Sequence, residues 1–264
     1  MYEIIDSHSH IYPDKIAEKA TQSIGEFYGI SMHTENGTVS NLLKYGKEAG
    51  VSRFVVHSCA TTVHQVHPIN EFILSEINKH SELIGYITLH PDMDKDTIES
   101  EISWSIDNGF KGIKLHPDFQ RFFIDEEKAK KIYDAAQGKL PILFHTGDKR
   151  FEYSKPHRLA NIARLYPDLT VIGAHFGGYS CWEQIDCYKS LGNVYLDTSS
   201  SLAFLSKEEA TDIINYFGAQ WFFFGVDFPM WKHNEEVERL LSLDLSEEQR
   251  KMIFAENIKR VLNI

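Results

Sequence analysis

Apolar runs of strand length alternate with segments of helical period along the whole chain. This alternation is typical of parallel βαβ units. Eight such units in 264 residues predict an α/β protein with a single (β/α)8 TIM barrel, one domain over residues 1–264. The predicted strands are residues 3–11, 51–59, 83–90, 110–116, 140–145, 169–175, 194–198 and 221–227.

Polar residues between the strands mark where helices begin. Helices are predicted to open near Asp14, Val39, Asp96 and Asp125, and another follows a polar and aromatic loop at residues 149–157. A serine, threonine or aspartate followed three positions later by Glu or Gln is a capping box. This spacing is found at Asp96 with Glu99, Ser206 with Glu209 and Ser246 with Gln249.

Histidines close most of the predicted strands. Side chains at i and i+2 of a strand share a face, so His8 and His10 can converge on one ion. Barrels of this kind carry their catalytic groups where the strands end. A ring of imidazoles would repel on protonation, and the clustering therefore favours a bound metal ion. The residues at these strand ends are His8, His10, His57, His90, His116, His145, His175 and Asp227.

Composition excludes several classes of partner. The formal net charge of -11 argues against nucleic acid, because such binding depends largely on neutralising phosphates. The cysteines, Cys59, Cys181 and Cys187, form no CxxC pair and are expected to be reduced thiols in a cytoplasmic protein. No apolar run approaches the length of a membrane span, and the N-terminus lacks the basic-apolar-small pattern of a signal peptide. A small-molecule substrate is the expected partner, with a homo-oligomer left open.

Taken together, these motifs resemble the amidohydrolase superfamily. The closer likeness is to the amidohydrolase-related group, which also includes metal-dependent decarboxylases. The likeness spans the chain and is carried by Asp-Ser-His-Ser-His at 6–10, His-Thr-Gly at 145–147, Pro-Asp-Leu at 167–169, Ala-His-Phe-Gly-Gly at 174–178, Tyr-Leu-Asp-Thr-Ser at 195–199, Phe-Gly-Val-Asp-Phe-Pro at 224–229 and the closing segment 256–262.

The resemblance implies a role for each matched residue. His8, His10 and His145 would bind one divalent ion, and Asp227 would be both a ligand and the base toward water. His175 would face the substrate as electrophile or general acid. Zinc is favoured, with Mn²⁺ or Fe²⁺ as alternatives. Such an ion would activate a bound water molecule, whose pKa can fall to about 7. The implied enzyme is a metal-dependent hydrolase acting on an amide, lactone or similar carbonyl of a small acidic substrate.

Other activities fit parts of the same pattern. A non-oxidative decarboxylase of a small aromatic or unsaturated acid would use the same residues. A metal-dependent nuclease of the TatD-like kind shares the leading His-x-His but typically ends strand eight in Glu-Thr-Asp, where this chain has Gly225-Val226-Asp227. A barrel retained as a binding or scaffold protein is a further alternative, which the complete set of candidate ligands disfavours.

Four further residues are candidates for substrate binding. Lys114 and His116 share a face of strand four. Lys114 would bridge two metals, pair with a substrate carboxylate, or pair with an acid inside the barrel; His116 would be a ligand, contact the substrate, or only orient the following turn. Arg121 is expected to clamp a carboxylate and Trp231 to form an apolar wall of the pocket. His57 and His90 are expected either to support the metal-bound histidines as hydrogen-bond partners or to lie at the rim.

Overall fold

Eight parallel strands follow one another in a single sheet, in the order β1 to β8. The computed structural model describes residues 2–264 and confirms the predicted (β/α)8 barrel. Every strand is shorter than predicted, most of all the last one. The strands are β1 (Ile5–His10), β2 (Arg53–His57), β3 (Leu83–Thr88), β4 (Gly112–Leu115), β5 (Ile142–Phe144), β6 (Val171–Gly173), β7 (Val194–Asp197) and β8 (Phe222–Phe223).

Helices fill the segments between the strands. The predicted capping boxes at Ser206 and Ser246 are both present. The helices are α1 (Asp14–Tyr28), α2 (Val39–Glu48), α3 (Val66–Ile77), α4 (Lys95–Asp107), α5 (Pro117–Gln120), α6 (Glu127–Ala136), α7 (Pro156–Leu165), α8 (Lys207–Phe217), α9 (His233–Leu241), α10 (Glu247–Lys251) and α11 (Asn257–Leu262). A π-helical segment, η4 (Met252–Glu256), links the last two, and 3-10 turns form η1 (Val63–Gln65), η2 (Trp182–Tyr188) and η3 (Ala219–Trp221).

Three details of the prediction are wrong. The capping residue of α4 is Asp94, whose side chain accepts a hydrogen bond from the backbone N–H of Thr97, so the predicted box at Asp96 does not form. Helix α6 begins two residues later than expected. Helix α3 has no counterpart in the prediction; its Pro68 lies in the first turn, where proline is tolerated.

The chain separates into two compact units. The first unit comprises residues 2–57, 80–84 and 198–264, and the second unit comprises residues 58–79 and 85–197. The prediction of one domain over residues 1–264 stays a prediction. Within residues 2–264, none of the helices is both long and apolar enough to cross a membrane.

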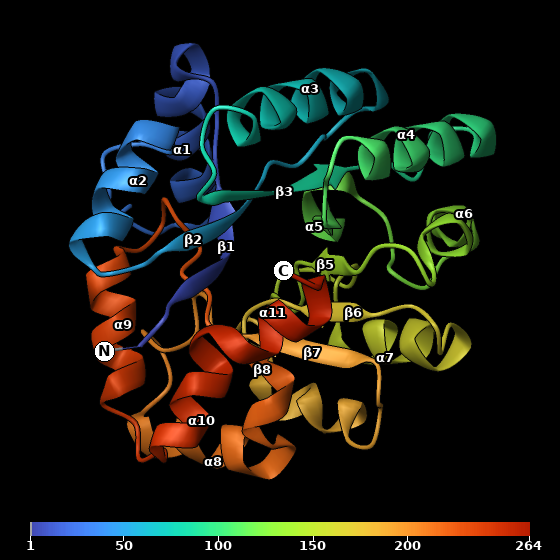
Figure 1. Cartoon of the computed structure of the whole chain (residues 1–264). Helices are drawn as coiled ribbons and strands as arrows, with labels where there is room; N and C mark the ends of the chain where they lie inside the picture. Colours follow the sequence, from blue (N-terminus) through green and yellow to red (C-terminus); the bar gives the residue numbers. More distant parts are fainter. Residues whose placement is uncertain (1) are drawn as a thin grey trace. The chain divides into compact units, whose positions relative to one another are not determined.

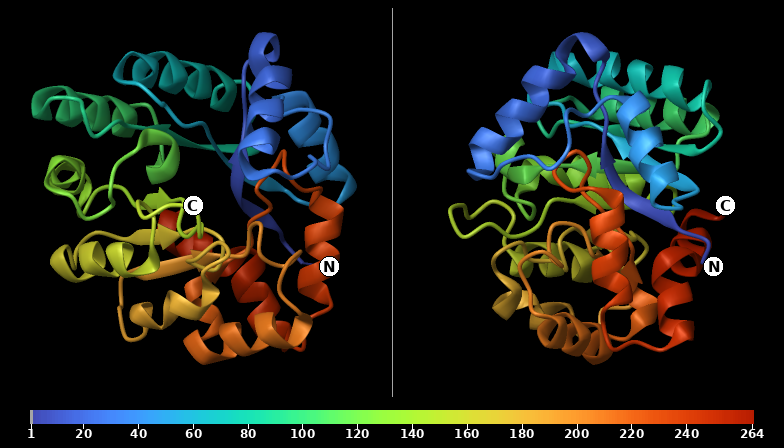
Figure 2. Two further views of the ribbon diagram at one scale, coloured as in Figure 1. Left: turned by 180° about the vertical axis from the view of Figure 1, so that it is seen from behind. Right: turned by 90° about the vertical axis from the view of Figure 1, so that its left-hand side faces the viewer.

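The first unit is built on β1, which is hydrogen-bonded along both edges. One edge pairs with β2, and the register shifts between Asp6 and Ser9, which marks a bulge. The other edge bonds to the segment that follows β8: Ser7 N–H donates to the Phe224 carbonyl at 2.8 Å and His10 N–H to the Phe228 carbonyl at 2.7 Å. Helices α2 and α9, far apart in sequence, lie side by side in this unit (Figure 1, Figure 2).

The second unit contains the consecutive parallel pairings from β3 to β7. Gly112 begins β4 opposite Tyr86, and a Cβ atom there would lie 2.5 Å from the Tyr86 ring. The glycine therefore makes room for a fully buried tyrosine beside the strand. Because β5 and β6 are only three residues long, the histidines predicted to end them lie in the loops that follow.

Candidate metal centre

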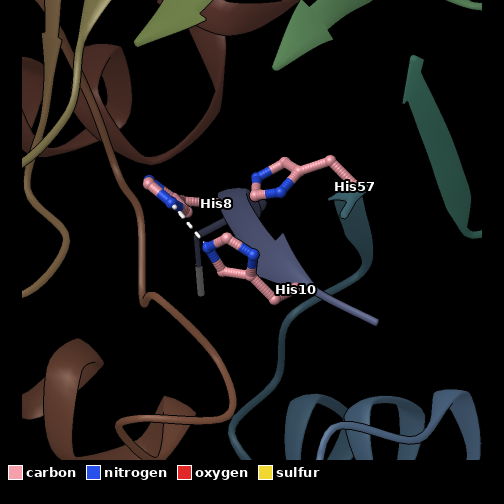
Figure 3. A group of neighbouring side chains, drawn as sticks. All are labelled: His8, His10 and His57. Carbon is pink, nitrogen blue, oxygen red and sulfur yellow. Dashed lines mark hydrogen bonds between the residues drawn. The ribbon is translucent and has the colours of Figure 1, made fainter. Parts of the chain in front are cut away.

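Three buried histidines gather at the ends of β1 and β2. His8 and His10 project from β1 and His57 ends β2, and the figure shows the three rings facing a common space (Figure 3). His8 Nε2 lies 3.3 Å from His10 Nε2. The His57 ring centroid lies 5.0 Å from that of His8 and 4.5 Å from that of His10. One ligand atom from each histidine lies within 4.8 Å of the others, so the three form a candidate metal-binding group.

Asp227 adds a carboxylate to this group. Its Oδ1 atom lies 3.5 Å from His8 Nε2 and 3.4 Å from His10 Nε2. A point equidistant from three atoms at these separations lies about 2.0 Å from each, which is the length of bonds from zinc to imidazole nitrogen and carboxylate oxygen. Two imidazoles and one carboxylate are also the donors that divalent transition metals prefer. His8, His10 and Asp227 therefore fit the metal ion that the sequence predicts.

Two serines on the segment after β7 hold these side chains in place. Ser199 Oγ lies 3.1 Å from His8 Nδ1, and a bond donated by this nitrogen leaves Nε2 as the lone-pair atom that faces His10 and Asp227. Ser200 Oγ donates to Asp227 Oδ2 at 2.5 Å. Trp231 Nε1 in turn donates to Ser200 Oγ at 2.9 Å.

A fully buried aspartate, Asp6, holds the backbone next to the candidate ligands His8 and Asp227. Its Oδ1 atom accepts hydrogen bonds from the backbone N–H of His8 at 2.9 Å and of Val226 at 3.0 Å. Its Oδ2 atom accepts a bond from His233 Nε2 at 3.0 Å and a short one from Ser9 Oγ. The carboxylate therefore ties the backbone of one candidate ligand, His8, to the residue that precedes the other, Asp227.

The second unit contains the other two residues to which the resemblance gives a catalytic or ligand role, His145 and His175. His145 Nδ1 lies 3.0 Å from His175 Nε2, so these two rings meet within the unit. His175 has a left-handed backbone with φ of 62°, and its N–H donates to Asp197 Oδ1 at 2.9 Å. Trp182 Nε1 donates to the His175 carbonyl at 3.0 Å. The backbone of His175 is thus fixed on both sides.

Asp118 and His116 surround His145. His145 Nε2 lies 3.3 Å from Asp118 Oδ2, which is also 2.7 Å from Ser154 Oγ. The His116 ring stacks on His145 with centroids 4.1 Å apart and on Phe119 at 3.7 Å. His116 also caps α5, because its Nδ1 atom accepts a bond from Phe119 N–H. His116 therefore orients the turn that follows it, and its role as a metal ligand or substrate contact stays a prediction.

The other predicted residues differ widely in burial. Lys114 is fully buried on β4, whereas Arg121, with φ of 56°, ends α5 at the surface. Trp231 is 5 % exposed in the first unit. Burial lowers the pKa of His90, which favours its neutral ring, and its Nδ1 accepts a bond from the Asp92 N–H. The roles of Lys114, Arg121 and Trp231 in substrate binding stay predictions.

Sequence reasoning missed several polar residues that hold the candidate ligands: Asp6, Asp118, Ser199, Ser200 and His233. Only Asp6 and Ser199 lie within stretches that carried the family resemblance. Asp118 carried a weaker signal, since it ends one of two Leu-His-Pro-Asp copies. Ser200 and His233 carried none, because their partners are distant along the chain.

Solved structures share the fold over the full chain. An uncharacterised TIM-barrel protein from Bordetella bronchiseptica superposes with a TM-score of 0.80 at 17% identity, covering 99% of this chain and 98% of that one. 5-Carboxyvanillate decarboxylase from Sphingomonas paucimobilis has a TM-score of 0.78 at 12% identity, covering 100% of both. Dihydroxybenzoic acid decarboxylase from Polaromonas, with bound manganese and 2-nitroresorcinol, has a TM-score of 0.74 at 16% identity, covering 100% and 97%.

Sequence comparison gives the family. No curated protein matches the chain in sequence. The family model described as amidohydrolase, in contrast, matches residues 5–264. This match covers every residue of the candidate centre, from His8 to Asp227. The chain therefore belongs to the amidohydrolase family and is a metal-dependent enzyme of that superfamily.

Proposed function

We propose that the protein is a hydrolase that uses one divalent ion, with zinc favoured, to cleave an amide, lactone or similar carbonyl of a small acidic substrate. The observation that carries the proposal is the triangle of His8 Nε2, His10 Nε2 and Asp227 Oδ1, with sides of 3.3 to 3.5 Å. An ion bound there supplies a Lewis acid that activates water and polarises a carbonyl.

The residues of the first unit prepare this centre before any ligand arrives. The Ser199 contact sets which nitrogen of His8 faces the centre, and Ser200 leaves Asp227 Oδ1 facing the two histidines. Each of these ligands is at least nine-tenths buried, so few water molecules compete for their lone pairs. The roles predicted for His145 as a ligand and for His175 as acid or electrophile remain part of the proposal.

Decarboxylation is the second candidate. It is favoured by the named activities of the structural neighbours, since two of the enzymes described above are decarboxylases of aromatic acids and cover the whole chain. The ligand set suits this reaction equally well, because a metal ion can orient a substrate carboxylate as a template. The substrate would then be a small aromatic or unsaturated carboxylic acid.

Product analysis separates the two reactions. Protein loaded with Zn²⁺ or Mn²⁺ would be incubated in ¹⁸O-labelled water with a panel of lactones, amides and hydroxybenzoic acids. Hydrolysis places one labelled oxygen in the product acid, whereas decarboxylation releases carbon dioxide and leaves the product unlabelled. The hydrolase proposal fails if metal-loaded protein releases carbon dioxide from an aromatic acid and hydrolyses no member of the panel.

A further inference from the structure

The hydrogen bonds around Ser200 can run in only one direction. An indole N–H is a donor without acceptor capacity, so Ser200 Oγ must accept the 2.9 Å bond from Trp231 Nε1. A carboxylate is only an acceptor, and it is a stronger one than the Met230 thioether sulfur 3.4 Å away, so the single hydroxyl proton of Ser200 points to Asp227 Oδ2 at 2.5 Å. The proton order from Trp231 through Ser200 to Asp227 is therefore set by chemistry as well as by distance.

We propose that Ser200 and Trp231 are positioning residues that fix the rotation of the Asp227 carboxylate for metal binding, an inference that rests on the proposed function. With Oδ2 held by Ser200, Oδ1 is the atom left facing His8 and His10. A carboxylate free to rotate would expose either oxygen, and ordering it would cost conformational entropy when the ion binds. Partners that orient a ligand typically contribute about 10- to 100-fold to metal affinity.

The backbone conformation supports this assignment. Ser200 and Asp227 have positive φ angles of 47° and 66°, a region that non-glycine residues occupy only where the surrounding structure enforces it. Two residues that follow α1 hold the segment after Asp227. His33 N–H donates to the Met230 carbonyl at 3.0 Å, and Thr34 Oγ1 donates to the Pro229 carbonyl at 2.7 Å. Asp227 and Trp231 therefore flank a segment that is fixed independently of any ligand.

The surroundings of Trp231 fit a positioning role better than a pocket wall. His33 packs on its ring with centroids 4.5 Å apart, and the Arg239 guanidinium lies 5.3 Å from the ring centroid. Phe204 meets the ring edge to face at 5.7 Å. With 5 % of its surface exposed, Trp231 offers little area to a substrate. If Trp231 contacts the substrate, the W231F variant should change KM. If Trp231 acts on Asp227 through Ser200, W231F should change the metal affinity instead.

Metal titration of a small set of variants tests the proposal. S200A, W231F and the double variant would be titrated with Zn²⁺ against a chromophoric chelator, with KM and kcat measured in parallel. S200G is included because glycine adopts the positive φ without strain, which guards against misfolding of S200A. The controls are S105A, a buried serine whose hydroxyl bonds the Ile102 carbonyl, and W104F, both on α4 of the second unit.

The expected pattern is distinctive. S200A and S200G should bind Zn²⁺ about 10- to 100-fold more weakly, W231F should lose several-fold, and the controls should match wild type. Because Trp231 acts only through Ser200, the double variant should be no weaker than S200A. Additive losses, unchanged affinity in S200G, or a W231F variant altered in KM alone would each overturn the assignment. Wild-type protein that binds none of Zn²⁺, Mn²⁺ and Fe²⁺ would instead refute the proposed function.

Discussion

Replacing Asp6 by asparagine should destabilise the folded protein by about 3 kcal/mol. The carboxylate is fully buried and accepts four hydrogen bonds, two on each oxygen. Asparagine retains one acceptor oxygen, which can keep the bonds from the backbone N–H groups of His8 and Val226. It presents an NH₂ group where Oδ2 receives the bonds from Ser9 and His233.

The magnitude follows from those two lost bonds. Hydrogen bonds to a charged group contribute about 1.5 to 3 kcal/mol each. Ser9 recovers part of this loss, because its hydroxyl can rotate and accept a bond from the amide. His233 recovers less, since accepting at Nε2 moves its proton to Nδ1, a buried atom with no hydrogen-bond partner among residues 2–264. A net loss of about 3 kcal/mol remains, or roughly 6 to 12 °C in Tm for a chain of this size.

Thermal unfolding followed by circular dichroism measures the effect. The matched control is D212N, the same exchange at an exposed position of α8, which should stay within about 0.5 kcal/mol of wild type. D6N should also bind Zn²⁺ more weakly, because Asp6 holds the backbone at His8 and at Val226. A D6N protein that melts within about 1 °C of wild type would refute the reasoning, since the buried carboxylate would then add nothing to stability.

Three further outcomes are expected. H8A should bind no stoichiometric Zn²⁺ by elemental analysis, whereas H175A should keep the metal and lose turnover; metal-free H175A would show that the predicted roles are wrong. D118A should lower stability by about 1 to 2 kcal/mol in thermal melts by removing the oxygen that accepts a bond from Ser154 Oγ and lies beside His145 Nε2, whereas D92A, which breaks an exposed ion pair, should cost under about 0.5 kcal/mol. Burial raises the pKa of Glu236 from 4.5 to about 8, so the folded protein binds an extra proton between these values and loses stability as the pH rises through them. E236Q should flatten that slope in pH-dependent denaturant titrations, and an unchanged slope would contradict it.

The barrel was predictable because its signals are local. Each strand is an apolar run followed by a polar turn, and the capping boxes at Ser206 and Ser246 lie within four residues. The short β8 shows where such signals end. Residues 224–227 are apolar enough to be predicted as strand, yet Asp227 adopts a φ of 66°. A strand cannot hold that angle, so the predicted end of the strand was wrong, although Asp227 lies beside His8 and His10. The role of Asp227 as a metal ligand stays a prediction.

The residues that support the candidate ligands were not predictable from sequence. The bond from Ser200 to Asp227 joins residues 27 positions apart, and the bond from His233 to Asp6 joins residues 227 apart. No spacing rule connects such pairs, because their contact depends on how the barrel brings loop ends together. Metal ligands carry a chemical signature in their residue type, whereas a serine or a buried aspartate is common throughout any chain. Their roles became visible only from distances and burial.

The two Leu-His-Pro-Asp copies show how far local sequence determines the site. In both, the histidine Nδ1 accepts a backbone N–H of the turn that follows, from Asp92 after His90 and from Phe119 after His116. The aspartates differ completely. Asp92 is exposed and pairs with Lys128 at 3.0 Å, whereas Asp118 is buried against His145. The tetrapeptide thus specifies a turn, and the tertiary environment decides whether its carboxylate becomes part of the site or remains in solvent.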